Sequence, residues 1–239
     1  MAPSSDTAEL IRQFLLASTA TLTSVLRKHG LGNTYMHGVA PLRPGTRMAG
    51  PAFTLRYIPA REDLGAGEVD NLRDAQRVAI EQVESGQVFA IDARGDTRAG
   101  TMGAILATRL QQRGAAGIVT DGAYRDSPII AELGMAAYAA AMNAHANKTV
   151  HHPSEFQVPI ACGGVAVFPG DWLVGDSEGV VVVPAHLAEA VAREAQEQEE
   201  KEDFIIKKIR AGASIVGTYP PDAQTLGEFA AWKKQKGKG

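Results

Sequence analysis

The sequence predicts one α/β or α+β domain in which helices pack on a sheet. Residues 88–120 read as a buried strand, a helix and a second strand, which is the pattern of a β-α-β unit with a parallel sheet. Residues 163–184 contain short apolar runs separated by Pro-Gly-Asp and Gly-Asp turns, which predicts several short strands. Because the 239 residues show no linker and no internal repeat, we expect a single domain over residues 1–239, with its core at about 19–210.

The chain opens with an amphipathic helix over residues 7–29, with a break near Ser18-Thr19 and a stop at Gly30. Residues 48–57 follow, and their alternation of apolar and polar side chains predicts a half-buried strand. The apolar residues of the opening helix recur at helical spacing: Leu10, Ile11, Phe14, Leu15, Ala17, Leu22, Val25 and Leu26.

The next helix is expected to run to Val83, because Asp70 or Asn71 can cap its first turn and Gly86 can close it. After it comes the β-α-β unit, whose parts are a strand at 88–93, a helix at 101–113 and a strand at 116–120.

A short helix is expected at 125–133, where Pro128 suits an early helical position. A long charged helix over 185–210 follows the β-rich part. The closing residues 233–239 are basic, and we interpret them as a solvated, mobile tail rather than an arm that binds nucleic acid.

The composition excludes several classes of partner. A net charge of −3 and a pI near 6.1 give no general attraction to nucleic acid or to an anionic membrane. No apolar run approaches the roughly 18–20 residues of a membrane span. Residues 1–8 are small and polar, so we expect no signal peptide. The lone cysteine, Cys162, lies in an apolar run and is expected to be a small buried hydrophobe in a reducing compartment. We therefore expect a cytoplasmic protein.

The residues best suited to chemistry are a glycine-opened helix start at Gly103 and the adjacent pair Arg125 and Asp126. A helix start offers unpaired backbone N–H groups to an anion, and an arginine can hold a carboxylate through two parallel hydrogen bonds. An aspartate can bind Mg²⁺, which usually takes one or two carboxylates and several waters. Asp126 also has a simpler explanation, because an acidic residue at a helix start complements the helix dipole.

Other polar residues gather near the same strand ends. Asp92, Asp96 and Asp121 are expected there, and Asp96 lies in a turn that its side chain can stabilise by bonding the backbone. Residues 142–153 form a polar insertion rich in histidine and asparagine, and we expect this segment to line a substrate pocket. A loop histidine, such as His145, His151 or His152, is a candidate for a place near the site. Consecutive histidines do not face one site, and a zinc centre is not expected.

Four segments of the chain together resemble the RraA-like family. The family includes the regulator of ribonuclease activity A and class II aldolases that act on 4-hydroxy-4-methyl-2-oxoglutarate and 4-carboxy-4-hydroxy-2-oxoadipate. The resemblance implies a swivelling β/β/α domain with flanking N-terminal and C-terminal helices. It also implies a homotrimer or homohexamer with the active site between subunits. The segments are AGPAFTLR (49–56), the Gly103 loop, GIVTDGAYRD (117–126) and CGGVAVFPGDWLVGDSEGVVVVP (162–184).

The resemblance further implies which residues form the site. Arg125 and Asp126 would be catalytic: Arg125 holds the carboxylate at the pyruvate end of the substrate, and Asp126 carries Mg²⁺ or Mn²⁺. In the family aldolases an aspartate is separated from the Arg-Asp pair by 20 residues, and the matching position here is Ala104. Backbone amides of one loop bind the same substrate carboxylate, and the loop consists of Gly103, Ala104, Ile105 and Leu106.

In the family aldolases, a glutamate from the neighbouring subunit's C-terminal helix supports the water shell of the metal. The acidic run 197–203 could supply it here, with Glu199 or Glu202 as the candidate. A solvated helix face with i,i+4 pairing is the simpler explanation for any single member of that run.

The resemblance, together with these residues, implies a metal-dependent carbon–carbon lyase that releases pyruvate from a small 2-oxo acid, as a 4-hydroxy-2-oxo acid aldolase or an oxaloacetate decarboxylase. Cleavage of the bond beta to a ketone leaves an enolate, for which a chelated metal is the electron sink. Retro-aldol cleavage also needs a base for the hydroxyl proton, so alanine at position 104 should impair it more than decarboxylation. The alternative is a non-catalytic RraA-type regulator that binds a ribonuclease or another protein. Arg125 and Asp126 favour the enzyme, and Ala104 favours the regulator.

Overall fold

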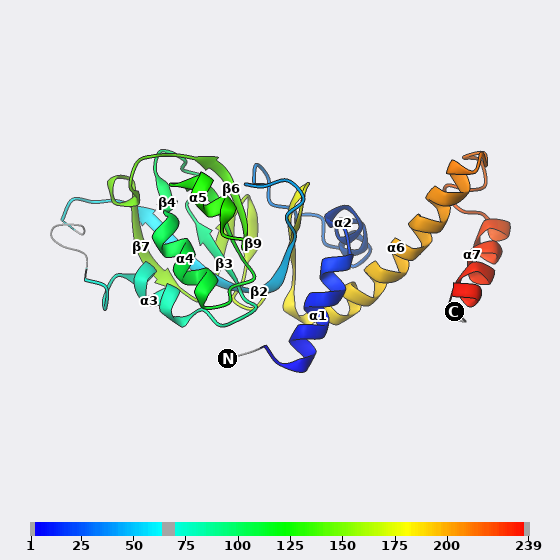
Figure 1. The fold of residues 1–239 in the computed structure, drawn as a ribbon, viewed down its shortest axis with the longest axis horizontal. Helices are drawn as coiled ribbons and strands as arrows, with labels where there is room; N and C mark the ends of the chain where they lie inside the picture. The colour runs from blue at the N-terminus through cyan, green and yellow to red at the C-terminus, as the bar shows by residue number, and fades with distance from the viewer. Residues whose placement is uncertain (1–2, 64–69, 237–239) are drawn as a thin grey trace.

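A mixed, barrel-like sheet forms the centre of the molecule in the computed structural model, which describes residues 3–63 and 70–236 (Figure 1). Across the sheet the strands are β1 (Ala40–Pro41), β6 (Ala136–Met142), β5 (Gly117–Tyr124), β3 (Val88–Asp92), β2 (Met48–Pro59), β10 (Trp172–Asp176) and β11 (Gly179–Val183). Two further strands join it, namely β4 (Gly100–Met102) beside β5 and β7 (His151–Phe156) beside β2. Neighbouring strands among β2, β3, β5 and β6 are parallel, which confirms the predicted β-α-β unit.

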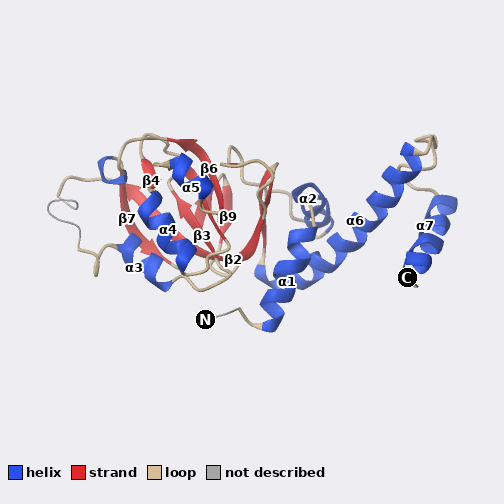
Figure 2. Cartoon of the chain, in the orientation of Figure 1, coloured by secondary structure: helices blue, strands red, loops and turns tan. Residues whose placement is uncertain are grey.

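Helices cover the sheet in two groups (Figure 2). The first group packs over the parallel strands and comprises α3 (Ala75–Gln82), α4 (Ala104–Gln112) and α5 (Ser127–Glu132). The second group packs on the antiparallel side and comprises α1 (Ser5–Leu16), α2 (Thr19–Lys28) and α6 (Ala188–Arg210). Helix α7 (Ala223–Lys236) lies beside the far end of α6, away from the sheet (Figure 1). The remaining elements are a hairpin of β8 (Ile160–Cys162) and β9 (Val165–Val167), and the 3₁₀ turns η1 (Asn147–Thr149) and η2 (Ala185–Leu187).

The two faces of the sheet bury alternate residues of the same strand. In β3, Phe89 and Ile91 pack toward α3 and α4, whereas Val88 and Ala90 pack toward the β8–β9 hairpin. Successive strand residues point to opposite faces, so a strand that is covered on both sides is apolar throughout. Strands β3 and β5 are fully buried because both faces of the sheet are packed against other elements. This packing gives the ends of the two strands a rigid support.

The predicted break in the opening helix is confirmed. Helix α1 ends at Leu16, and the Ser18 side chain accepts a hydrogen bond from the Thr21 backbone N–H at the start of α2. A serine in this position satisfies one of the unpaired N–H groups at a helix start, which lets a new helix begin in a new direction. Cys162 is also buried as expected, and burial raises the pKa of its thiol.

Three predicted helix boundaries are wrong. Helix α3 is capped by Asp74, because its carboxylate accepts from the Arg77 N–H at 3.2 Å, whereas Asp70 and Asn71 lie before the helix. The helix expected from residue 101 begins at Ala104, because residues 100–102 pair with β5 instead. The helix expected from residue 125 begins at Ser127.

The closing segment also departs from its prediction. Residues 233–236 belong to helix α7 rather than to a mobile tail, and residues 237–239 lie outside the described part of the chain. Lys233 pairs with Glu200 at 2.9 Å, and Trp232 packs against Phe204 and Phe229. These aromatic contacts pack α7 against α6. The basic composition of residues 233–239 did not indicate this packing. None of the helices in residues 3–63 and 70–236 is long and apolar enough to cross a membrane.

Candidate active site

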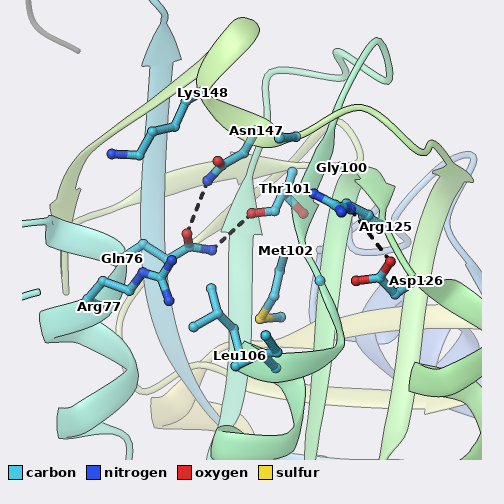
Figure 3. Close-up of a pocket in the computed structure, with 13 residues that line it drawn as sticks. Gln76, Arg77, Gly100, Thr101, Met102, Leu106, Arg125, Asp126, Asn147 and Lys148 are labelled. Atoms are coloured by element: carbon cyan, nitrogen blue, oxygen red, sulfur yellow. Dashed lines mark hydrogen bonds and ion pairs between the residues drawn. The ribbon is translucent and has the colours of Figure 1, made fainter. Parts of the chain in front are cut away.

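A pocket of about 360 Å³ opens where strand β4, the start of α4 and the end of β5 meet (Figure 3). Parallel strands end at the same edge of a sheet, and ligands commonly bind beyond that edge. The wall of the pocket contains five of the predicted site residues: Gly103, Ile105, Leu106, Arg125 and Asp126. The structure therefore brings together the two parts of the motif that the sequence separates by a helix and a strand.

Asp126 occupies the junction between β5 and α5 with φ at +56°, in the left-handed region. Aspartate tolerates this backbone conformation better than most residues, and such conformations are frequent at functional sites. The Ala104 backbone N–H donates to Asp126 Oδ2 at 3.3 Å. A Cβ at Gly103 would lie only 2.8 Å from the same oxygen, so a side chain there would push the carboxylate away from the start of α4.

Arg125 lies beside this carboxylate without being buried by it. Its Nε is 3.5 Å from Asp126 Oδ1, and the two side chains are 48% and 39% exposed. The Arg125 backbone N–H donates to the Met102 carbonyl at 2.9 Å. The two segments pack closely, because a Cβ at Gly100 would lie 2.6 Å from the backbone nitrogen of Arg125. Strand β4 thus holds the Arg125 backbone, while the guanidinium stays accessible to a ligand. A half-exposed ion pair of this kind contributes little to stability.

Ala104 contributes its backbone rather than its side chain. The N–H points to Asp126, whereas the methyl group belongs to the apolar cluster under α4 and is 9% exposed. The backbone of position 104 therefore lies in the first turn of α4 beside Asp126, and the chain offers no carboxylate there.

The opposite wall of the pocket is formed by helix α3, which was not predicted, and by residues 146–148 of the polar segment, which was expected to line a pocket. Gln76 of α3 is buried, its Nε2 donates to the Thr101 carbonyl at 2.9 Å, and its Oε1 accepts from Asn147 Nδ2 at 3.1 Å. Arg77 and Lys148 complete this wall (Figure 3). The asparagine-rich segment was a signal for Asn147, whereas a polar residue on the buried face of a short helix was the only signal for Gln76.

The histidines do not line the pocket, so that prediction is wrong. His151 belongs to β7, where it is buried, stacks on Tyr57 at 5.4 Å and lies 3.4 Å from the Ala99 carbonyl through Nε2. Burial lowers the pKa of His151, because it disfavours the charged form of the ring. Pairing of β7 with β2 turns a segment that reads as a loop into a strand.

The three aspartates serve the backbone of the strand ends. Asp121 accepts from the Ala93 N–H at 2.7 Å and the Gly95 N–H at 3.0 Å, and burial raises its pKa. Asp96 accepts from the Arg98 backbone and guanidinium, and the guanidinium hydrogen bond holds the pKa of this carboxyl far below its usual range. The structural role predicted for Asp96 is confirmed.

Glu199 and Glu202 lie on α6, far from the pocket within one chain (Figure 1). Glu199 Oε1 accepts from the Ser18 N–H at 2.7 Å, and Glu202 Oε1 accepts from Gln198 at 2.6 Å. Burial raises the pKa of Glu199, but hydrogen bonds from Ser18 and Thr21 outweigh it, so the pKa lies below its ordinary value. Only a second copy of the chain could bring either glutamate to Asp126.

Asp126 offers a divalent ion a single carboxylate. Within the part of the chain that the structure describes, no three His, Cys, Asp or Glu side chains come together as a metal site. Mg²⁺ is often held by one or two carboxylates and keeps several waters. An accessible aspartate on the wall of a roomy pocket therefore fits an ion whose shell is completed by water and by a ligand.

The fold and the pocket define an α/β protein with an arginine–carboxylate pair at the start of a helix. A family model described as RraA-like, Aldolase/RraA, matches residues 19–182, and the chain belongs to this family. A protein of Halalkalibacterium halodurans named "Putative 4-hydroxy-4-methyl-2-oxoglutarate aldolase" is 31% identical over 211 residues, which cover 88% of this chain and 93% of that protein.

Solved structures confirm the predicted RraA-like fold. Streptomyces coelicolor RraAS2, described as "an unusual member of the RNase ES inhibitor RraA protein family", has a TM-score of 0.76 and 34% identity, over 85% of this chain and 97% of that chain. An uncharacterized protein from Pseudomonas syringae pv. tomato has a TM-score of 0.79 and 26% identity, over 92% of this chain and 95% of that chain.

Proposed function

We propose that this chain is a divalent-metal-dependent lyase that releases pyruvate from a small 2-oxo acid. The observation that carries the proposal is the meeting of Arg125, Asp126 and the first turn of α4 on one pocket wall. The aldolase name of the H. halodurans relative supports the same class of reaction.

Each part of the wall has a distinct role in this proposal. Arg125 binds the substrate carboxylate with its planar fork, and the unpaired N–H groups of Ile105 and Leu106 assist it at the start of α4. Asp126 would hold Mg²⁺ or Mn²⁺ together with water and substrate oxygens. When bound, the metal supplies a Lewis acid next to the keto group.

The reaction type follows from the carboxylates available. Asp126 is the one carboxylate among the described residues that line the pocket. Retro-aldol cleavage needs a base for the hydroxyl proton, whereas decarboxylation of oxaloacetate does not. We infer that oxaloacetate decarboxylation is faster than cleavage of 4-hydroxy-2-oxo acids unless a second subunit supplies the base.

Pyruvate release is expected only with a divalent ion. The purified protein should release pyruvate from oxaloacetate or a 4-hydroxy-2-oxo acid in Mg²⁺ or Mn²⁺, above the rate of the ion alone, and lose this release in a chelator. Asp126→Asn should lose the metal-dependent release of pyruvate, because a neutral amide binds Mg²⁺ weakly. A coupled assay for pyruvate measures both. Equal release with and without chelator would exclude a role for the metal in the reaction. No release from any 2-oxo acid would overturn the proposal that the chain is a lyase.

A non-catalytic regulator is the second candidate. Alanine at position 104 and the likeness to RraAS2, described as a member of an RNase ES inhibitor family, favour it. If the chain is a regulator, Arg125→Ala should still bind the protein partner, because Arg125 lies in a pocket rather than on an apolar surface. The pyruvate assay separates the two candidates directly.

We also propose that the chain forms a homotrimer or a homohexamer. The far end of α6 and the turn that follows it carry an apolar groove of about 500 Å³. Four of the large apolar side chains there are between 48% and 84% exposed, and such patches are typical of protein interfaces. They are Ile206, Ile215, Val216 and Tyr219.

Light scattering is expected to give the mass of a trimer or of a multiple of it. Ile215→Glu should shift the assembly toward monomer, because a charge would be buried in the contact. Leu72→Glu, at an exposed leucine near α3, is the matched control and should leave the mass unchanged. A wild-type protein that is monomeric at micromolar concentration and releases pyruvate would contradict an active site shared between subunits.

A further inference from the structure

We propose that Arg77 determines substrate specificity by binding the distal carboxylate of a 2-oxo dicarboxylic acid whose pyruvate end is held by Arg125. The inference rests on the proposed function, because it assumes that Arg125 binds the carboxylate next to the keto group. It names the residue that would bind the other end of the substrate, and neither the motif nor the names of the relatives assign that residue.

Arg77 is positioned by helix α3. It lies in the first turn of that helix, where its backbone N–H donates to the Asp74 carboxylate at 3.2 Å. Its half-buried side chain forms part of the pocket wall, on the side opposite Arg125 and Asp126 (Figure 3). A packed helix and a fixed first turn give the guanidinium a defined place relative to Arg125.

The guanidinium of Arg77 has no acidic partner among residues 3–63 and 70–236. The other basic groups around the pocket do have one: Lys148 Nζ lies 3.3 Å from Asp74 Oδ2, and Arg125 lies beside Asp126. Arg109, on the neighbouring α4, forms two hydrogen bonds with Glu81. A half-buried cation without a counter-charge is stabilised by an anionic ligand, so Arg77 is the group on this wall that a second carboxylate would engage.

The surroundings of Arg77 keep this wall rigid. Gln76 is 2% exposed and connects the Thr101 carbonyl to the Asn147 side chain. Buried polar networks whose members are all bonded hold their elements in one arrangement. The spacing between the two arginines is therefore set by packed helices and strands rather than by a loose loop. A fixed spacing is needed if the pocket is to discriminate between substrates of different length.

Apolar side chains lie between the two charged walls. Met102 and Leu106 line the pocket between Arg77 and Arg125 (Figure 3). A ligand that matches this lining has a carboxylate at each end and a short carbon chain between them. A five-carbon 2-oxo dicarboxylic acid has that pattern, whereas a 2-oxo acid with a methyl end leaves Arg77 without a partner.

The test compares two ligands that differ only at the distal end and undergo no retro-aldol cleavage. These are 2-oxoglutarate and 2-oxopentanoate, titrated by calorimetry in Mg²⁺ into the intact assembly. The wild type is expected to prefer 2-oxoglutarate by about tenfold or more, because charge-assisted hydrogen bonds contribute on that scale. Arg77→Gln is expected to abolish this preference and to leave pyruvate and 2-oxopentanoate binding unchanged. Arg77→Lys should restore part of the preference.

Arg73→Gln is the matched control, because Arg73 precedes the same helix, is exposed, pairs with Asp70 at 3.5 Å and does not line the pocket. It should keep the wild-type preference. A preference that survives in Arg77→Gln while pyruvate still binds would overturn this inference alone. Equal weakening of all three ligands would mean that Arg77 only supports the fold, which also overturns it. Failure of the wild type to bind pyruvate would overturn the proposed function and this inference together.

Discussion

Replacement of Arg125 by alanine is expected to weaken pyruvate binding and to lower kcat/KM for 2-oxo acids by at least about tenfold. Hydrogen bonds to charged groups contribute about 1.5–3 kcal/mol, and the guanidinium can form two with one carboxylate. Arg125→Lys should recover little of the loss, because a single ammonium group cannot reproduce the fork. Calorimetric titration with pyruvate and a pyruvate-release assay measure the two effects.

The fold should tolerate this change. The Arg125 side chain is 48% exposed, and its backbone, rather than its side chain, bonds to strand β4. Arg12→Ala is a suitable control, since Arg12 is an exposed residue of α1 that pairs with Glu9 and lies outside the pocket. Unchanged binding and kinetics in folded Arg125→Ala and Arg125→Lys would place the substrate carboxylate elsewhere.

The second large effect is expected for Ala104→Asp. The residue lies in the first turn of α4, and its backbone N–H already bonds to Asp126. The apolar cluster that holds the Ala104 methyl disfavours a carboxylate, so the aspartate side chain would turn toward Asp126 and the pocket. There it could accept the hydroxyl proton that retro-aldol cleavage must remove. General acid–base assistance typically contributes about 10²–10⁴-fold, so the rate of 4-hydroxy-4-methyl-2-oxoglutarate cleavage relative to oxaloacetate decarboxylation should rise at least about tenfold.

Ala104→Asn is the control that separates charge from size. Asparagine has nearly the shape of aspartate but cannot act as a base at neutral pH. Both variants lose some stability, because the methyl group they replace is 9% exposed and belongs to an apolar cluster. The aspartate variant should also bind Mg²⁺ more tightly, since two neighbouring carboxylates repel each other until a cation is present. An unchanged ratio in folded Ala104→Asp, or the same gain in Ala104→Asn, would contradict this role.

The active-site pair was predictable because its members are adjacent in the chain. Arg125 and Asp126 directly follow strand β5, and the glycine before α4 is a local helix signal. The sequence therefore places a cation, a carboxylate and free N–H groups at one β-α-β unit. The nearness of Gly103 to Asp126 was not predictable in detail. It depends on the left-handed backbone at Asp126 and on the absence of a side chain at Gly103, which bring the two segments close together.

The far wall of the pocket was predictable only in part, since the polar segment 142–153 indicated a pocket lining but α3 did not. Gln76 and Asn147 are 71 positions apart in the chain, and their hydrogen bond exists because α3 and the η1 turn meet over β4. Arg77 likewise reads as an ordinary surface residue of an amphipathic helix until the opposite wall is in place. Its lack of an acidic partner within the described residues is a property of the assembled pocket.

The sequence by itself determined the order of most helices and strands, the break at Ser18 and the Arg125–Asp126 pair. Helical periodicity, caps and turns depend on residues within a few positions of one another, so they can be read along the chain. Only the tertiary structure decided that residues 151–156 form a strand, that α7 folds back onto α6 and that Arg77 faces Arg125. These features arise from side chains and backbone groups that are distant in the chain and come into contact only when the core packs. Local sequence patterns therefore do not predict them.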